Sequence, residues 1–376
     1  MSGNDGVRYA MLKIGITGVA GLIGWHMRAY LHSQPNCETI PADRATFANE
    51  QRLDAFVASA DAIVHLAGMN RGDDTAIEQT NIALVEALVA ACERGRRTPH
   101  IVFSSSTHIM GDTAYARSKR ECAECFRQWA KRSGGRFTNL ILPHVFGEGG
   151  KPFYNSVVST FCHQLANGEA SRVVHDGELE LVHAQEVAET VLRIIRAGEV
   201  GEVRVAGVAM KVSQLLQKLV QFDAQYRAQL LPDTMAAIDL RLFNTYRSYL
   251  FPHHYPVSLK LHEDNRGALF EAIKTIPGGQ CFISTTKPGV TRGNHYHTKK
   301  IERFLVLGGS GLIRVRKLFS DEVAEFAVSG TQPQYIDMPV LHTHNITNVG
   351  ETEMTTLFWS NEIFDPANPD TFPEKV

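Results

Sequence analysis

The chain of 376 residues is long enough to form two domains, each with its own hydrophobic core. Hydrophobic residues make up 44% and charged residues 21%, as in ordinary globular proteins, and a formal net charge of −2 excludes a strongly basic nucleic-acid binder. The sequence has no apolar stretch long enough to span a membrane. With six scattered cysteines and a polar beginning, we predict a cytoplasmic protein with a flexible tail over residues 1–11.

The first predicted element is a short apolar strand at residues 13–17, followed by a glycine-rich loop and a helical pattern. The loop has the spacing G-x-x-G-x-x-G. In dinucleotide-binding proteins, such glycines let the backbone approach a pyrophosphate, and the helix N-terminus supplies N–H groups and a positive dipole. We predict that five residues of this loop contact the cofactor: Gly18, Gly21, Leu22, Ile23 and Gly24.

Asp43 and Arg44 follow the second predicted strand, which lies near residues 38–40. An acidic residue at this place would hold a ribose 2′-hydroxyl and favour NAD, whereas an arginine would hold a 2′-phosphate and favour NADP. Both residue types are present. We favour NADPH as the cofactor, through Arg44.

The third predicted strand, at residues 61–68, ends in Leu66, Ala67 and Gly68, which we also place in the cofactor site. Strands and helices then alternate as far as residue 142, which predicts an α/β fold with a Rossmann-like, doubly wound parallel sheet. Ligands of such sheets bind at the carboxyl ends of the strands, where all these motifs fall.

Serines end the fourth predicted strand, and a helix with Tyr115 and Lys119 follows. Residues four apart share one helical face, so the Lys119 ammonium can favour the phenolate of Tyr115, whose ordinary pKa is about 10. A serine at the strand end can hold a substrate oxygen beside the phenol. We predict Ser106 for this role, with Ser105 as the alternative. This set suits a carbonyl that gains or loses hydride.

Tyr154 and Asn155 lie in an irregular stretch before further helical patterns, and we expect this half of the domain to bind the substrate. The dinucleotide-binding domain is predicted to cover residues 12–250. A linker at 251–257 leads to a second domain at 258–376. There, short β-rich segments separated by glycine and proline indicate a small all-β barrel.

Four residues of the β-rich domain form a candidate metal site. His295 and His297 are two apart, so on a strand they point to one face, and Glu302 and His344 can join them from neighbouring strands. Three imidazoles and a carboxylate suit zinc, iron, manganese or nickel. His342 is a weaker candidate on the same face as His344.

The two sets of motifs resemble known families. The first two thirds resemble the extended short-chain dehydrogenase/reductase family, and the last third resembles the cupins, which form a jelly roll. The fusion resembles the bifunctional UDP-sugar epimerase/reductases of bacterial capsular polysaccharide synthesis. The resemblance runs from about residue 13 and is carried by four strings: His65–Arg71, Lys151–Val157, Arg292–His297 and Asn361–Asp370.

This resemblance implies that the cupin domain inverts C3 of a UDP-2-acetamido-2,6-dideoxy-hexos-4-ulose and that the first domain then reduces the C4 ketone with NADPH. Epimerisation must come first, because the C3 proton is acidic only while C4 is a carbonyl. The resemblance also implies that Tyr115 donates the proton, that Lys119 contacts the nicotinamide ribose, that the metal is zinc and that the protein is a homodimer.

Some positions depart from the family patterns. Leu341 stands where cupins normally have glycine, and Ile141 and His144 stand where the reductases have arginine and asparagine. Arg266 lies in a stretch similar to the substrate-binding start of dTDP-keto-sugar 3,5-epimerases, in which the histidine equivalent to His295 is the catalytic base. His295 is therefore either a metal ligand or a base.

Two other functions stay open at this point. The chain could act on a related NDP-linked 4-keto sugar and use its cupin only as a structural, dimerising module. It could also be a sugar sensor that binds a dinucleotide without turnover, although such a sensor has no need of the serine, tyrosine and lysine set.

Overall fold

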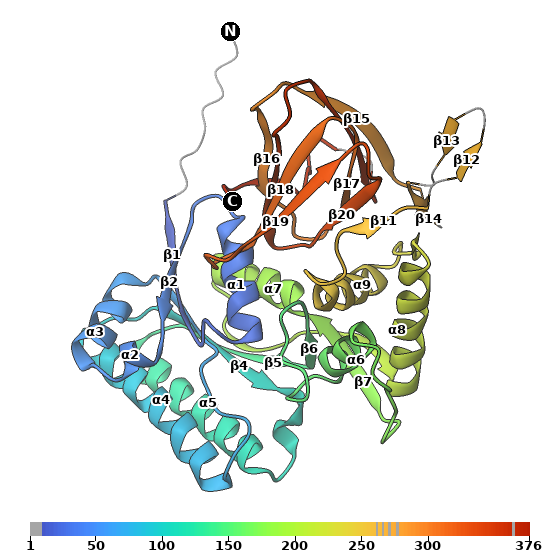
Figure 1. Ribbon diagram of the computed structural model, residues 1–376. Coiled ribbons are helices and arrows are strands. Elements are labelled where there is room, and N and C mark those ends of the chain that lie inside the picture. Colours follow the sequence, from blue (N-terminus) through green and yellow to red (C-terminus); the bar gives the residue numbers. More distant parts are fainter. Residues whose placement is uncertain (1–9, 261, 265–266, 270–271, 276–277, 363–364) are drawn as a thin grey trace. The chain divides into compact units, whose positions relative to one another are not determined.

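The computed structural model describes residues 10–260, 262–264, 267–269, 272–275, 278–362 and 365–376 (Figure 1). By packing, the chain forms two compact units: Met1–Phe146 with Leu179–Ala209, and Gly147–Glu178 with Met210–Val376. The second unit therefore combines helices from before residue 250 with the β-rich end of the chain. The linker predicted at residues 251–257 rests on the change from alternating strands and helices to short β-rich segments, and it remains a prediction.

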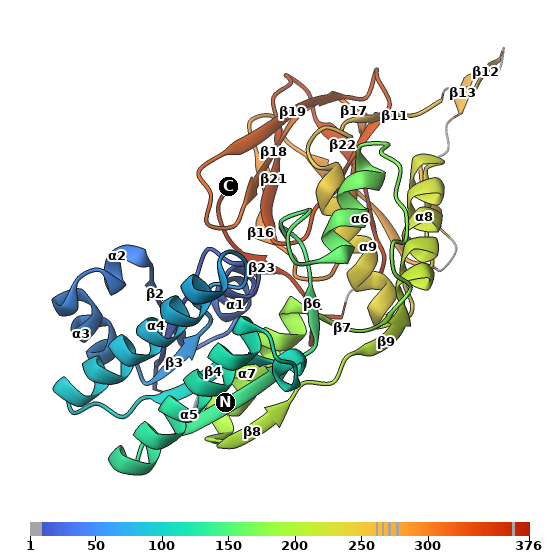
Figure 2. The same ribbon diagram turned by 90° about the horizontal axis from the view of Figure 1, so that it is seen from below.

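The first unit is built on a six-stranded parallel sheet in the order β2-β1-β3-β4-β5-β8. Its strands are β1 (Leu12–Thr17), β2 (Cys37–Ala42), β3 (Ala62–His65), β4 (His100–Ser106), β5 (Phe137–Leu142) and β8 (Gly201–Arg204). The helices on its two faces are α3 (Glu50–Ser59), α4 (Asp74–Arg94) and α5 (Ala114–Ser133), opposite α1 (Leu22–His32) and α7 (Ala184–Ala197) (Figure 2). Short helical turns are α2 (Arg44–Phe47) and η1 (Thr107–Met110). The predicted doubly wound sheet is confirmed.

Alternate strand residues supply the two cores of this unit. Ile63 and Phe103 pack with α3, α4 and α5, whereas Val64 and Val102 pack with α1 and α7. Because both faces of the sheet are covered, nearly every position of the central strands β3, β4 and β5 is buried, as parallel strands between two helical layers require.

The second unit joins three helices to two antiparallel sheets. The helices are α6 (Val157–Ala166), α8 (Val212–Arg227) and α9 (Ala237–Leu250). One sheet contains β11 (Val257–Ser258), β20 (Gln334–Met338), β17 (Glu302–Gly308), β22 (Met354–Ser360) and β15 (Gln280–Thr286). The other contains β19 (Val323–Ser329), β18 (Ser310–Lys317), β21 (His342–Asn348), β16 (Thr291–Tyr296) and β23 (Phe372–Pro373). Phe304, Ile313 and Ile346 share the core of the two sheets, which confirms the predicted all-β architecture.

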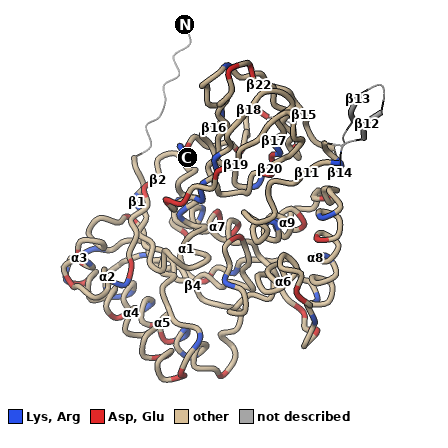
Figure 3. The backbone as a smooth tube through the Cα atoms, viewed as in Figure 1, with Lys and Arg blue, Asp and Glu red and all other residues tan. Residues whose placement is uncertain are grey.

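The remaining strands are short. β6 (His144–Phe146), β7 (Glu178–His183) and β9 (Val208–Lys211) form a three-stranded sheet, β10 (Leu230–Leu231) pairs with β14 (Lys274–Thr275), and β12 (His262–Asp264) pairs with β13 (Gly267–Leu269). Acidic and basic residues are interspersed over the described parts of both units (Figure 3). Among the helices that the structure describes, none is long and apolar enough to cross a membrane.

A buried ion pair connects the helices of the second unit to its strands. Arg303 on β17 and Asp337 on β20 are 1% and 0% exposed, and their guanidinium and carboxylate groups meet at 2.7 and 3.0 Å. Tyr226 of α8 donates a hydrogen bond to the same carboxylate, and Arg247 of α9 donates to the carbonyl of Met338 at 2.7 Å. Burial would raise the pKa of Asp337, but Arg303 outweighs it and holds that pKa below its ordinary value.

Asp337→Ala should lower the free energy of unfolding by about 3–5 kcal/mol, because it leaves the Arg303 charge buried without its partner. Urea denaturation measures this loss. The exposed Asp321→Ala is the matched control, for which we expect a change within about 0.5 kcal/mol. Equal stabilities of the two variants would contradict the importance of the pair.

Candidate active site and metal centre

The glycine-rich loop joins β1 to α1 at the carboxyl edge of the sheet. Gly18 has a φ of +72°, and a Cβ there would lie 2.8 Å from the backbone nitrogen of Ala67. A Cβ on Gly24 would lie 2.2 Å from the carbonyl oxygen of Gly18. Both positions therefore need glycine for the loop to pack tightly.

The start of α1 is suited to a phosphate group. Gly21 is the N-cap residue of the helix and has no side chain with which to cap the first turn, which contains Leu22 and Ile23. The first N–H groups of a helix need partners outside it, and an anion satisfies them and the helix dipole together. The loop therefore fits the pyrophosphate of a dinucleotide.

Thr17, at the end of β1, holds the neighbouring loop in place. Its hydroxyl accepts hydrogen bonds from the N–H groups of Leu66 at 3.1 Å and Ala67 at 3.0 Å, and it lies 3.0 Å from Nδ1 of His65. Leu66 and Ala67 are half-buried and Gly68 is exposed. No role is predicted for Thr17 from the sequence above, although a hydroxyl directly before a glycine-rich loop could have indicated one.

Asp43 and Arg44 have different structural roles at the end of β2. The carboxylate of Asp43 caps α2 by accepting hydrogen bonds from the N–H and the hydroxyl of Thr46, both at 2.9 Å. These hydrogen bonds lower the pKa of Asp43. Arg44 is the first residue of α2 and is exposed, so its guanidinium can reach a ligand at this edge of the sheet.

Tyr115 and Lys119 lie on the first turns of α5. The ammonium of Lys119 is buried and donates a hydrogen bond to the carbonyl oxygen of Ser104 at 2.6 Å, while it lies 5.5 Å from the centre of the Tyr115 ring. Burial lowers the pKa of Lys119 to about 8 and raises the pKa of Tyr115 to about 12. This differs from the expected stabilisation of the phenolate, because the phenol loses its hydration and Lys119 bonds to Ser104 instead.

Ser105 and Ser106 point to opposite faces of β4, as successive strand residues do. Ser106 is partly exposed, and its hydroxyl accepts a hydrogen bond from the N–H of His108 at 3.1 Å. Ser105 is buried. Of the two, Ser106 therefore has the better access to a ligand.

The three predicted substrate-binding residues do not belong to the same unit as Tyr115 or lie outside the described residues. Tyr154 and Asn155 are exposed residues of the second unit, and the Tyr154 ring centre is 5.2 Å from Nζ of Lys151. Tyr115 belongs to the first unit. Arg266 lies outside the described residues. The roles of these three substrate contacts remain predictions.

The structure brings the four predicted metal ligands together. Nε2 atoms of His295, His297 and His344 lie 3.7, 2.8 and 3.4 Å from Oε2 of Glu302. All four ligand atoms are within 4.8 Å of one another. His295 and His344 are directly opposite each other on β16 and β21, next to a bulge at Asn294, which has a φ of +61°.

The protonation state of the cluster suits a metal ion. Burial would raise the pKa of Glu302, but the three neighbouring imidazoles outweigh it and keep that pKa well below its ordinary value. Burial lowers the pKa of His344 to about 4. Within the described part of the chain, the Nε2 atoms of the three histidines are buried without a well-aligned hydrogen-bond partner. A carboxylate with neutral imidazoles is the donor set that zinc prefers.

Backbone carbonyl groups orient two of these histidines. Nδ1 of His344 bonds to the carbonyl oxygen of His342 at 3.1 Å, and Nδ1 of His297 bonds to that of Asp370 at 2.6 Å. Because a carbonyl can only accept, each Nδ1 carries a proton, which leaves Nε2 as the ring atom that would bind a metal ion. His342 thus contributes its carbonyl, while its own ring packs against Phe251 with centroids 5.2 Å apart.

Leu341 adopts the conformation that explains why cupins normally have glycine at this position. Its φ is +59°, in the left-handed region, and its side chain is fully buried. In this conformation its N–H donates a hydrogen bond to the carbonyl oxygen of His297 at 2.8 Å. The loop that precedes His344 therefore contains a leucine in a backbone conformation that favours glycine.

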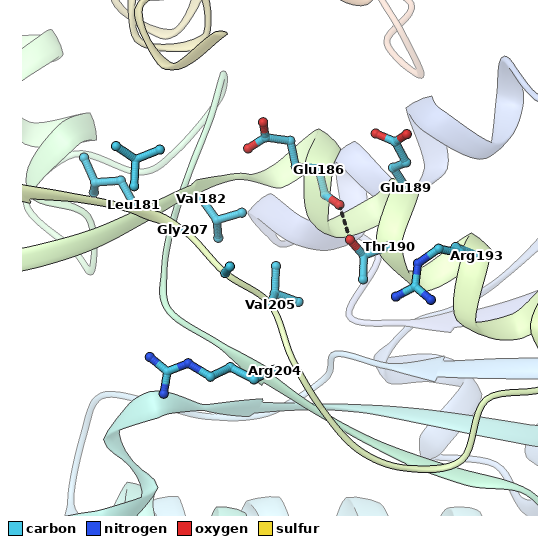
Figure 4. Close-up of a pocket in the computed structure, with 11 residues that line it drawn as sticks. Leu181, Val182, Glu186, Glu189, Thr190, Arg193, Arg204, Val205 and Gly207 are labelled. Carbon is cyan, nitrogen blue, oxygen red and sulfur yellow. Dashed lines mark hydrogen bonds between the residues drawn. The ribbon is translucent and has the colours of Figure 1, made fainter.

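A surface hollow of about 420 Å³ lies beside α7 in the first unit (Figure 4). Its charged residues interact locally: Glu186 accepts from the N–H of His183, Arg193 pairs with Glu199, and Arg204 pairs with Glu180. The described residues that line it include none of the predicted site residues. We therefore do not place the cofactor or metal site there.

Comparisons with known proteins agree with this geometry. The model of the NAD dependent epimerase/dehydratase family matches residues 14–207, and that of the polysaccharide biosynthesis C-terminal domain matches residues 262–372. The chain is 30% identical over 369 residues to the UDP-2-acetamido-2,6-beta-L-arabino-hexul-4-ose reductase of Pseudomonas aeruginosa, which covers 96% of this chain and 98% of that protein.

Solved structures with similar folds include the capsular polysaccharide assembling protein CapF from Staphylococcus aureus. It is 33% identical, with a TM-score of 0.63, and the match covers 97% of this chain and 100% of CapF. CapF with the inhibitor 3-isopropenyl-tropolone is 32% identical over the same shares, with a TM-score of 0.59. The chain therefore belongs to the NAD dependent epimerase/dehydratase family and, over nearly its whole length, to the family of the Pseudomonas UDP-sugar reductase.

Proposed function

We propose that this chain is an enzyme with two active sites that act in turn on one UDP-linked 4-keto amino sugar in capsule or surface polysaccharide synthesis. The β-rich part epimerises C3 of a UDP-2-acetamido-2,6-dideoxy-hexos-4-ulose, and the first unit reduces the C4 ketone. The observation that carries the proposal is that one chain holds both Tyr115 beside the buried Lys119, at the carboxyl edge of a parallel sheet that follows a glycine-rich loop, and a convergent cluster around Glu302. We include a homodimer and a cytoplasmic location in the proposal.

In the reduction step, bound NADPH supplies the hydride. Tyr115 donates a proton to the ketone oxygen, and its raised pKa keeps the phenol protonated at neutral pH. Ser106 would hold the same oxygen, and Lys119 would contact the nicotinamide ribose. Gly18, with the rest of its loop, binds the pyrophosphate.

In the epimerisation step, a base removes the C3 proton, the electron pair of that bond passes to the C4 carbonyl as an enolate, and a proton returns to the opposite face. A divalent ion, most favourably zinc, would supply Lewis-acid polarisation of the carbonyl. His297, Glu302 and His344 would hold it. His295 has the most exposed side chain of the four, at 23%, and would serve as the fourth ligand or as the base.

Tyr115→Phe should lower the rate of NADPH oxidation by about 10²–10⁴-fold, because the proton donor is lost. The affinity for NADPH, measured by fluorescence titration, should stay nearly unchanged. A variant with most of its turnover would remove Tyr115 from the mechanism. A wild-type chain that binds NADPH but never oxidises it with the keto sugar would favour a sensor.

Arg44→Ala should reduce the preference for NADPH over NADH by about 10- to 100-fold, since one charge-assisted contact with the 2′-phosphate is lost. The ratio of the two kcat/KM values measures the preference. Arg52→Ala, at an exposed position on the nearby helix α3, is the control and should leave the ratio unchanged. Equal kcat/KM values for both cofactors in the wild type would contradict the assignment.

His344→Ala should abolish deuterium exchange at C3 of the keto sugar, measured by NMR in deuterated water without NADPH, and should release bound metal. The exposed His253→Ala is the control, and Tyr115→Phe should exchange normally because the enolate needs no hydride. Wild-type exchange and metal content in His344→Ala would exclude His344 from the site. A wild type that reduces the sugar without any C3 exchange would favour a purely structural cupin.

A further inference from the structure

The string Asn361–Asp370 has no role in the proposed reactions. Its last residue, Asp370, contacts His297 of the candidate metal site. Asp370 is 5% exposed and has a φ of +40°. Its carboxylate accepts hydrogen bonds from the N–H groups of Thr298 at 3.1 Å, Lys299 at 3.0 Å and Lys300 at 2.8 Å, and from the Thr298 hydroxyl at 2.6 Å. Three successive N–H groups around one carboxylate form an anion-binding nest.

The same residue also contacts the ligand that precedes this nest. The backbone carbonyl of Asp370 accepts the hydrogen bond from Nδ1 of His297 at 2.6 Å. This bond sets both the tautomer and the direction of the ring, whose Nε2 lies 2.8 Å from Glu302. One residue thus holds the backbone on the C-terminal side of His297 through its side chain and the His297 ring through its carbonyl.

The segment around Asp370 is fixed on both sides. Nζ of Lys300 donates to the carbonyl oxygen of Pro369 at 2.6 Å. Beyond Asp370, β23 pairs with β16 at His295 and Tyr296, and the Phe372 ring stacks on Tyr296 with centroids 5.3 Å apart. The C-terminal segment therefore supports the strand and the turn that carry two of the four ligands.

We propose that Asp370 is a positioning residue for the metal site, which keeps His297 in the Nδ1–H tautomer with its Nε2 directed at the metal. This inference rests on the proposed metal-binding function. It assigns a role to a residue that neither binds the metal nor reacts with the sugar.

Asp370→Asn tests the inference with little change in size. We expect the metal-free full chain to bind Co²⁺ and Zn²⁺ about 10- to 100-fold more weakly than the wild type, the usual cost of losing a group that orients a ligand. The absorption of bound Co²⁺ follows the titration. The control is Asp365→Asn, on the same segment, where the carboxylate accepts a hydrogen bond within its own turn, from the N–H of Ala367 at 2.9 Å. It should change the affinity less than about twofold.

A second measurement needs no metal. In the metal-free wild type labelled with ¹⁵N-histidine, we expect Nδ1 of His297 to carry a proton, and in Asp370→Asn a mixture of rings with and without a proton on Nδ1. Wild-type metal affinity in Asp370→Asn, or an Nδ1 of His297 without a proton in the wild type, would overturn the inference alone. A wild-type chain that binds neither metal would instead overturn the proposed function.

Discussion

Strand β17 carries Glu302 and Arg303 as consecutive residues, and a strand sends consecutive side chains to opposite faces. Glu302 therefore lies among the histidines, while Arg303 lies against Asp337 and stacks at 3.6 Å on the Tyr335 ring. The buried ion pair holds the strand in register, because a slip by one residue would exchange the two faces. The geometry of the cluster thus depends on a charge pair on the other side of the sheet.

This ion pair also explains why helices from the middle of the chain belong to the unit formed by the β-rich end. Tyr226 of α8 shares the carboxylate of Asp337, and Arg247 of α9 bonds to the backbone of the next residue, Met338. Buried charges are costly unless every polar partner is satisfied. Helices and sheets therefore have to pack as one body for the pair to be tolerated.

Burial governs the chemistry of both candidate sites, in opposite ways. At the carboxyl edge of the parallel sheet, burial destabilises the charged forms of Tyr115 and Lys119. The phenol of Tyr115 therefore stays protonated and can donate a proton. In the cluster, three imidazoles around one carboxylate overcome the same desolvation and keep Glu302 ionised. In the proposed mechanism, the first site donates a proton to the carbonyl substrate and the second would place a positive charge beside its oxygen.

The sequence by itself determined the doubly wound sheet, the glycine-rich loop and the grouping of the four cluster residues. These depend on strand and helix periods and on short spacings, such as those between His295, His297 and Glu302. The hydrophobic pattern does not predict β20 as a buried strand, because it contains the charged residue Asp337. Burial of that carboxylate is tolerated because Arg303 pairs with it. Only the tertiary structure decided the direction of the Tyr115 pKa shift, which depends on burial. It also decided the contact of His297 with Asp370, because hydrogen bonds between residues 73 positions apart leave no periodic signal in the sequence.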